Sequence, residues 1–238
     1  MRSGREFKTP ESFVDAFGRV LGGASADPAF LHAFWLLTQI PLAARGPTFA
    51  ADLRALGIKV PPDPSLMDVA AGFAGEVDRY AREKGGRTDL GEMAQMAAVE
   101  SLMSTVGPDL PSLFQPAPHD VQRALGRLAS GERFSVLARE FFARLTERTL
   151  AYYLSRELSN HIGFGKRFSD DTARSRFDQS LAWYCREASQ IVEAFAGAWY
   201  GKHVYQGAGI TPVTVGYFAP VAFKKLRDEL RQGRDAYE

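Results

Sequence analysis

Residues 170–201, DDTARSRFDQSLAWYCREASQIVEAFAGAWYG, show the clearest helical pattern in the chain. Apolar or small residues recur at alternating spacings of four and three, at Phe177, Leu181, Tyr184, Ala188, Ile191, Phe195 and Ala198. This period places them on one side of an α-helix, as in a coiled-coil seam. Ser169 is a suitable N-cap, and Asp170 and Asp171 put negative charge where the helix dipole favours it. The pattern predicts one long helix from Asp170 to about Gly201.

A second helical pattern precedes this stretch, from about Glu132 to Ile162. Its apolar positions are Leu137, Phe141, Leu145, Tyr152 or Tyr153, Leu154 and Leu158. The two patterns are joined by GFGKRFSD (163–170), which is short enough to make the two helices antiparallel neighbours. We therefore expect a long antiparallel helical hairpin in the C-terminal half.

Helical periodicity also dominates the rest of the chain, and alternating apolar and polar runs are nearly absent. We expect a first helix through 13–21, and a second that begins after Asp27 with Pro28 in its first turn and is bent or ended at Pro41. The other expected helical segments are 49–56, 66–80, 90–103, 120–128 and 221–234, with a brief extended stretch within 207–218. The predicted fold class is an all-α multi-helix bundle.

Four prolines between Gly107 and Pro118 interrupt the helical pattern. The segment has no helical periodicity, and connections of this kind often separate domains. We therefore predict an N-terminal helical subdomain (1–107), a proline-rich connection (108–119) and a C-terminal helical subdomain with the long hairpin (120–238).

The composition limits the partners and the location of the protein. Lys plus Arg is 29 and Asp plus Glu is 28, so the chain as a whole does not attract phosphate backbones or anionic lipids. The single cysteine, Cys185, forms no internal disulfide and suits a reducing compartment. The apolar run Ala29–Ala44 is too short to span a membrane, and the first ten residues do not resemble a signal peptide. We expect a cytoplasmic protein without a transmembrane segment.

Chemically active residues are few in this sequence. Glu157 and His161 stand four residues apart, so a carboxylate and an imidazole share a helix face and are the weak candidates for a metal or a proton-transfer pair. The metal-binding spacings of di-iron bundles and of zinc proteases are missing, so a local ion pair or a helix-end cap is favoured. Cys185 beside the seam is best explained as a packed side chain. We expect no catalytic residues, no metal site and no cofactor.

Aromatic and basic residues alternate at the end of the long helix, at Trp199, Tyr200, Lys202, His203 and Tyr205. Such a cluster can stack bases and hold phosphates. The alternative, a helix end whose rings pack against the last helix, is favoured.

A basic stripe is predicted on the last helix, because Lys224, Arg227, Arg231 and Arg234 recur at spacings of three, four and three residues. Ala222, Leu226 and Leu230 lie on the opposite side of this helix, and Asp228, Glu229 and Asp235 dilute the positive field. A solvated face is the default interpretation.

These features favour a non-enzymatic helical interaction or assembly subunit of a cytosolic complex, which binds a protein partner or itself. The long seam and the 17 Phe, 8 Tyr and 3 Trp support this hypothesis, as does the lack of a converging catalytic set. One alternative is a nucleic-acid-associated accessory protein that binds the backbone through the C-terminal aromatic and basic patch. Another is a helical-bundle enzyme or small-ligand binder that uses Glu157 and His161.

Overall fold

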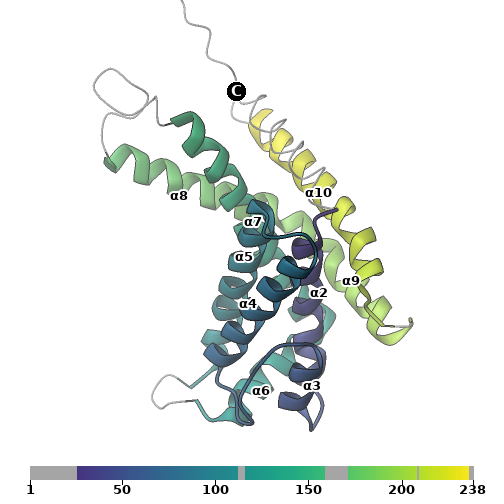
Figure 1. Ribbon diagram of the computed structural model, residues 1–238. Helices are drawn as coiled ribbons and strands as arrows, with labels where there is room; N and C mark the ends of the chain where they lie inside the picture. Colours follow the sequence, from purple (N-terminus) through teal and green to yellow (C-terminus); the bar gives the residue numbers. More distant parts are fainter. Residues whose placement is uncertain (1–25, 112–115, 159–170, 208, 236–238) are drawn as a thin grey trace, which may run out of the picture.

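The computed structural model describes residues 26–111, 116–158, 171–207 and 209–235, and within these ranges it contains helices and no strands (Figure 1). The elements in chain order are α2 (Pro28–Ala43), α3 (Phe49–Ala55), α4 (Leu66–Glu83), α5 (Asp89–Val106), the 3-10 helix η1 (Gly107–Asp109), α6 (Pro118–Arg127), α7 (Gly131–Leu158), α8 (Asp171–Ala188), α9 (Gln190–Tyr205) and α10 (Pro212–Asp235). The predicted all-α bundle is confirmed.

Helix α2 begins as its sequence predicts. Asp27 is the N-cap, and its Oδ1 accepts a hydrogen bond from the Phe30 amide at 2.9 Å. Pro28 occupies the first turn, where its missing N–H has no partner to lose. Pro41 lies inside the helix, which ends two residues later at Ala43. The apolar run of the sequence is therefore a core helix.

The predicted single helix from Asp170 to Gly201 is divided in two. Helix α8 ends at Ala188, and α9 begins at Gln190 after a turn at Ser189. The Ser189 hydroxyl donates to the Cys185 carbonyl at 2.7 Å, a side-chain bond that commonly bends helices. Both α8 and α9 pack against α7, so the hairpin has one long arm and one broken arm.

Helix α10 begins at Pro212, so residues 212–218 of the predicted extended stretch are helical and the predicted start near Val221 is wrong. Thr211 and Thr214 cap this start reciprocally: the Thr214 amide donates to Thr211 Oγ1 at 3.3 Å, and the Thr211 amide donates to Thr214 Oγ1 at 2.9 Å. The added turns bury Val215, Phe218 and Ala219 against the bundle. This tertiary packing outweighs the weak local preference for an extended chain.

Phe34 of α2 lies at the centre of the core. Its ring centroid is 5.3 Å from that of Phe141, 5.4 Å from that of Phe142 and 5.3 Å from that of Phe218. These rings join α2, α7 and α10. Buried side chains from both sides of residues 108–119 belong to one hydrophobic cluster, and the division into subdomains stays a prediction.

Some predicted features lie outside the described residues. These are the helix through 13–21, His161, the loop 163–170 and the side chain of Glu157, whose backbone belongs to α7. Among the residues that are described, no helix is long and apolar enough to cross a membrane.

Candidate functional site

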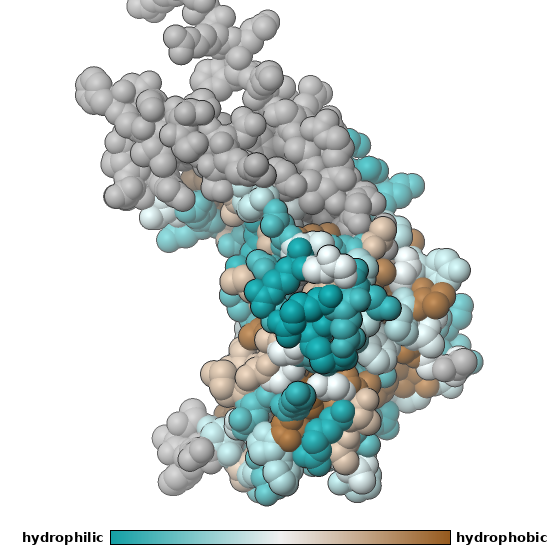
Figure 2. All heavy atoms as spheres, viewed as in Figure 1, coloured by the Kyte–Doolittle hydropathy of each residue, from teal (hydrophilic) through white to brown (hydrophobic). Residues whose placement is uncertain are grey.

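The outward face of α10 carries a row of exposed apolar side chains. Val213, Tyr217 and Val221 follow one another at four-residue spacing and are 65%, 75% and 47% exposed. In Figure 2, hydrophobic residues reach the surface along the right-hand side, where Figure 1 places α10. Single exposed apolar residues are ordinary on protein surfaces, whereas a row on one helix face is typical of a contact surface. We call Val213, Tyr217 and Val221 the apolar row.

The predicted basic stripe continues beyond this row. Lys224 is exposed, and within the described part of the chain it has no ion pair or hydrogen bond. Arg227 is half-buried with its Nη2 3.4 Å from Asp228 Oδ1, and Arg231 is also half-buried. The backbone of Arg234 belongs to α10, but its side chain is not among those that the structure describes. Among the described side chains of the stripe, Lys224 is therefore the one most open to a partner.

Two members of the predicted aromatic cluster belong to the core. Tyr200 is fully buried, stacks on Phe134 at a centroid distance of 4.0 Å, and donates its hydroxyl to the Thr38 carbonyl at 3.3 Å. Burial raises the pKa of its phenol. Trp199 is half-buried, with its ring centroid 4.4 Å from that of Phe218. The Tyr200 ring therefore has no face available for a base.

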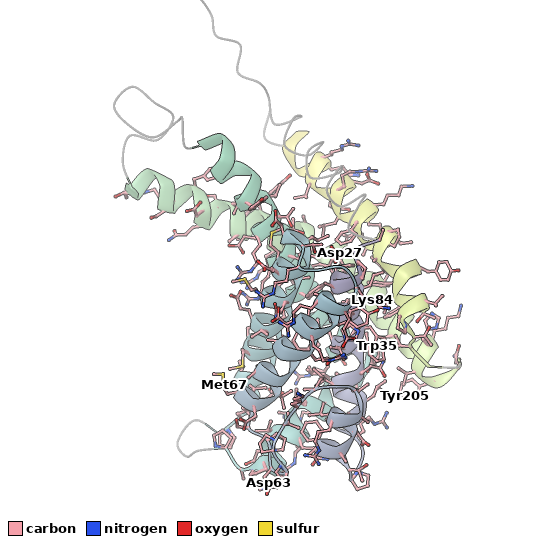
Figure 3. The ribbon with its side chains drawn as sticks, in the orientation of Figure 1. Asp27, Trp35, Asp63, Met67, Lys84 and Tyr205 are labelled. Atoms are coloured by element: carbon pink, nitrogen blue, oxygen red, sulfur yellow. The ribbon has the colours of Figure 1, made fainter. Side chains whose placement is uncertain are left out.

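The other three members of the cluster lie nearer the surface. Lys202 is exposed and His203 is half-buried, with its ring centroid 5.4 Å from that of Trp199. Tyr205, labelled in Figure 3, is exposed at the end of α9, and its hydroxyl accepts a hydrogen bond from Arg45 Nη1 at 3.1 Å. The predicted cluster is thus divided between the core and the surface.

Cys185 is fully buried, and this burial raises the pKa of its thiol. A thiol that holds its proton is a poor nucleophile and a poor metal ligand. Over the described residues, no three His, Cys, Asp or Glu side chains come together in a way that could hold a metal ion. The structure therefore places Cys185 in the packed interior, as its position beside the seam indicated.

A buried ionic network that the sequence analysis missed joins α2 to α4. His32 Nε2 lies 3.2 Å from Glu76 Oε1, and Glu76 is only 3% exposed. Arg79 binds the same carboxylate with two donors, Nε to Oε2 at 2.7 Å and Nη2 to Oε1 at 2.6 Å. The His32 ring stacks on Tyr80 at a centroid distance of 3.8 Å. Every buried charge in this network is paired, as burial requires.

The environment sets opposite protonation preferences for the two partners. Desolvation lowers the pKa of His32, although the hydrogen bond to Glu76 acts in the other direction. For Glu76, desolvation favours the neutral acid, but the hydrogen bonds from Arg79 and His32 outweigh it and lower the pKa of the carboxyl. At neutral pH the network is a neutral imidazole that donates its Nε2–H to an ionised carboxylate.

Protein stability should therefore fall as the pH drops below 6.5, the ordinary pKa of histidine. Below that pH the unfolded chain takes up a proton at His32, whereas the folded protein resists it, so protonation favours unfolding. The contribution of Glu76 is present above the ordinary carboxyl pKa of 4.5 and is lost as the pH falls through the lower folded value. Urea denaturation at a series of pH values measures this loss.

His32→Gln provides the matched variant, because it keeps a donor but removes the titrating ring. We expect it to flatten the pH dependence of the unfolding free energy between pH 6.5 and about 5. An unchanged slope in His32→Gln would contradict the assignment.

A sequence signal for this network exists, but it is incomplete. His32 interrupts the apolar run of α2, and Glu76 lies between Phe73, Val77 and Tyr80 on the apolar face of α4. Polar residues at core positions indicate buried partners. Which residues pair across 44 positions of sequence depends on how α2 and α4 pack.

Comparison of the chain with protein-family models, curated proteins and solved structures found no match.

Proposed function

We propose that this protein is a non-enzymatic helical subunit that binds another protein through the outward face of α10. The observation that carries the proposal is the apolar row, in which the exposed Val213, Tyr217 and Val221 share one helix face. Four-residue spacing is how one helix presents side chains to the groove of another. Covering these side chains removes apolar surface from water, which is the main favourable term in protein association.

The partner that fits this face is an amphipathic helix whose apolar side is followed by carboxylates. The apolar row spans eight residue steps, or about 12 Å of helix, and so forms the centre of a contact. Lys224 follows Val221 by three residues and is exposed without an ion pair among the described residues. A carboxylate opposite Lys224 would set the orientation of the partner helix, because charges at the rim of an interface act mainly on specificity and association rate.

The nucleic-acid alternative has less support. It relied on aromatic rings for base stacking, and Tyr200 is buried while Trp199 is half-buried. It also relied on a basic stripe, in which Arg227 lies beside Asp228. Binding to oligonucleotides that weakens steeply with salt would favour this alternative.

Site-specific photocrosslinking in cells tests the proposal. A benzophenone amino acid is placed at position 213, 217 or 221 in turn, and at the exposed Ala51 of α3 as the control. We expect the three positions of the apolar row to crosslink to one protein, and mass spectrometry to locate the crosslink in an amphipathic helix with carboxylates. Crosslinks to a second copy of the chain, or equal crosslinking from position 51, would overturn the proposal.

Binding of the purified, identified partner gives the quantitative prediction. Tyr217→Ala should raise the Kd by roughly tenfold to a hundredfold, because exposed tyrosines in helical contacts are frequent hot spots. The single variant Lys224→Glu should also raise the Kd and should slow association. Gln190→Ala changes an exposed residue on α9 and should leave the Kd unchanged. Isothermal titration calorimetry measures all three, and an unaltered Kd for Tyr217→Ala is the contrary result.

A further inference from the structure

An open cavity of ≈ 400 Å³ lies between α4 and the loop that precedes it. Its volume falls within the roughly 300–1,000 Å³ that is usual for small-molecule sites. Glu76 and Arg79 of the buried network form part of its lining, together with Lys59 of the loop and Arg82 of α4. The cavity is therefore lined by several charged groups, and its residues are separate from the apolar row on α10.

Glycines allow the loop and α4 to approach each other around this cavity. A Cβ on Gly72 would lie 2.6 Å from the Lys59 carbonyl oxygen, so the loop backbone rests directly on the helix. Gly57 has a φ of +87°, and a Cβ there would lie 2.5 Å from a carboxylate oxygen of Glu76. A Cβ on Gly75, in contrast, would meet no heavy atom within 4 Å. Gly75 therefore faces open space in the wall of the cavity.

Both carboxylate oxygens of Glu76 and one of Asp68 already accept hydrogen bonds within the fold. Glu76 accepts two hydrogen bonds from Arg79 and one from His32. Asp68 Oδ2 accepts from both the amide and the hydroxyl of Ser65, at 2.9 and 2.6 Å, in the capping box of α4. These acceptors are used within the fold, so they do not favour a cationic ligand.

The cations of the lining retain unused donors. Lys59 is exposed, and its ammonium makes no hydrogen bond or ion pair within the part of the chain that is described. Arg82 donates from Nη1 to Asp78 at 2.8 Å, and the guanidinium of Arg79 uses three of its five N–H groups, on Glu76 and Glu83. Apart from Asp68 Oδ1, the charged side chains of the lining have only donors left to offer, and the three cations outnumber the two carboxylates.

We propose that this cavity binds a small molecule bearing a carboxylate or phosphate group. Lys59 and Arg82 hold the anionic group from the loop and from the helix, and the outward donors of Arg79 complete its coordination. The uncharged part of the molecule lies over Ala71 and Gly75, where the lining has little or no side chain. The pairing of Glu76 with Arg79 fixes the guanidinium in place before the ligand arrives, which reduces the entropy lost on binding.

Titration calorimetry at low ionic strength tests this site, with inorganic phosphate and citrate as separate probes. We expect at least one probe to bind. Lys59→Ala and Arg82→Ala should each raise the Kd of that probe by about tenfold. Lys84→Ala removes an exposed cation near the end of the same helix that does not line the cavity, and it should have no effect. Binding of phosphate alone assigns a phosphate ligand, and binding of citrate alone assigns a carboxylate ligand.

A second variant tests the cavity without changing any charge. Gly75→Leu puts a side chain into the open space, so it should abolish probe binding while the helical circular dichroism is retained. Failure of both probes to bind the unchanged protein would overturn the proposal. So would equal weakening by Lys84→Ala, or full binding by Gly75→Leu, because each would show that the anion associates with general surface charge.

Discussion

Phe34→Ala is expected to lower the free energy of unfolding by about 3–5 kcal/mol, the largest effect of any single change considered for this protein. Phe34 is fully buried, and its ring lies against Phe141, Phe142 and Phe218. Truncation removes apolar contact with both α7 and α10 and leaves a cavity where three helices meet. Urea denaturation followed by far-ultraviolet circular dichroism measures the change.

Phe195→Ala is the matched control, because it is the same chemical change at a half-buried position on α9. Its ring centroid is 5.2 Å from that of Phe218, and Lys225 Nζ lies over the ring, 5.7 Å from its centroid. We expect it to lower the unfolding free energy by only about 1–2 kcal/mol, because truncation at a half-exposed position leaves less cavity. Equal losses for the two variants would show that Phe34 is not at the centre of the core.

Gly197→Ala is expected to lower the free energy of unfolding by about 2–3 kcal/mol through steric overlap. A Cβ at Gly197 would lie 2.7 Å from the carbonyl oxygen of Gly131, and one at Gly131 would lie 2.7 Å from that of Gly197. The neighbouring atoms belong to backbone, so α7 and α9 must separate to make room. The same denaturation experiment measures this variant.

Gly201→Ala on the same helix should have the opposite sign. A Cβ at Gly201 would meet no heavy atom within 4 Å, so the substitution gains helix propensity of about 0.5–1 kcal/mol without overlap. A stabilising Gly197→Ala would contradict the close crossing of α7 and α9. Loss of stability in both variants would indicate that α9 does not tolerate alanine for some other reason.

The helical character of the chain could be predicted from sequence because it depends on local interactions. The apolar run from Ala29 to Ala44, the Asp27 cap and Pro28 in the first turn together specify α2. The same reasoning located α4 and α5 between their glycine and proline breaks. It also located α7 and predicted that a second helix follows it after a short connection. The sequence also predicted part of the exposed face of α10, because its spacing placed Lys224 on the side opposite Leu226 and Leu230.

The candidate sites could be predicted only in part. The sequence analysis kept Tyr200 among the candidate binding residues while favouring packed rings, and the fold stacks Tyr200 on Phe134 and hydrogen-bonds it to Thr38, 162 positions away in sequence. The apolar row was missed because Val213 and Tyr217 were assigned to an extended stretch. In the helix they join Val221 on one face, one turn apart, whereas the sequence analysis ended the extended stretch at residue 218 and began the last helix at Val221, so it assigned the three residues to two separate elements.

The sequence by itself determined the all-α class, the Asp27 cap of α2 and the approximate extent of α4, α5 and α7, because these depend on residues within one or two turns of each other. The tertiary structure decided where the predicted helix breaks at Ser189, where α10 begins, and which partners His32 and Glu76 find. These outcomes depend on contacts between distant segments. Their free energies of a few kcal/mol are as large as the local preferences with which they compete.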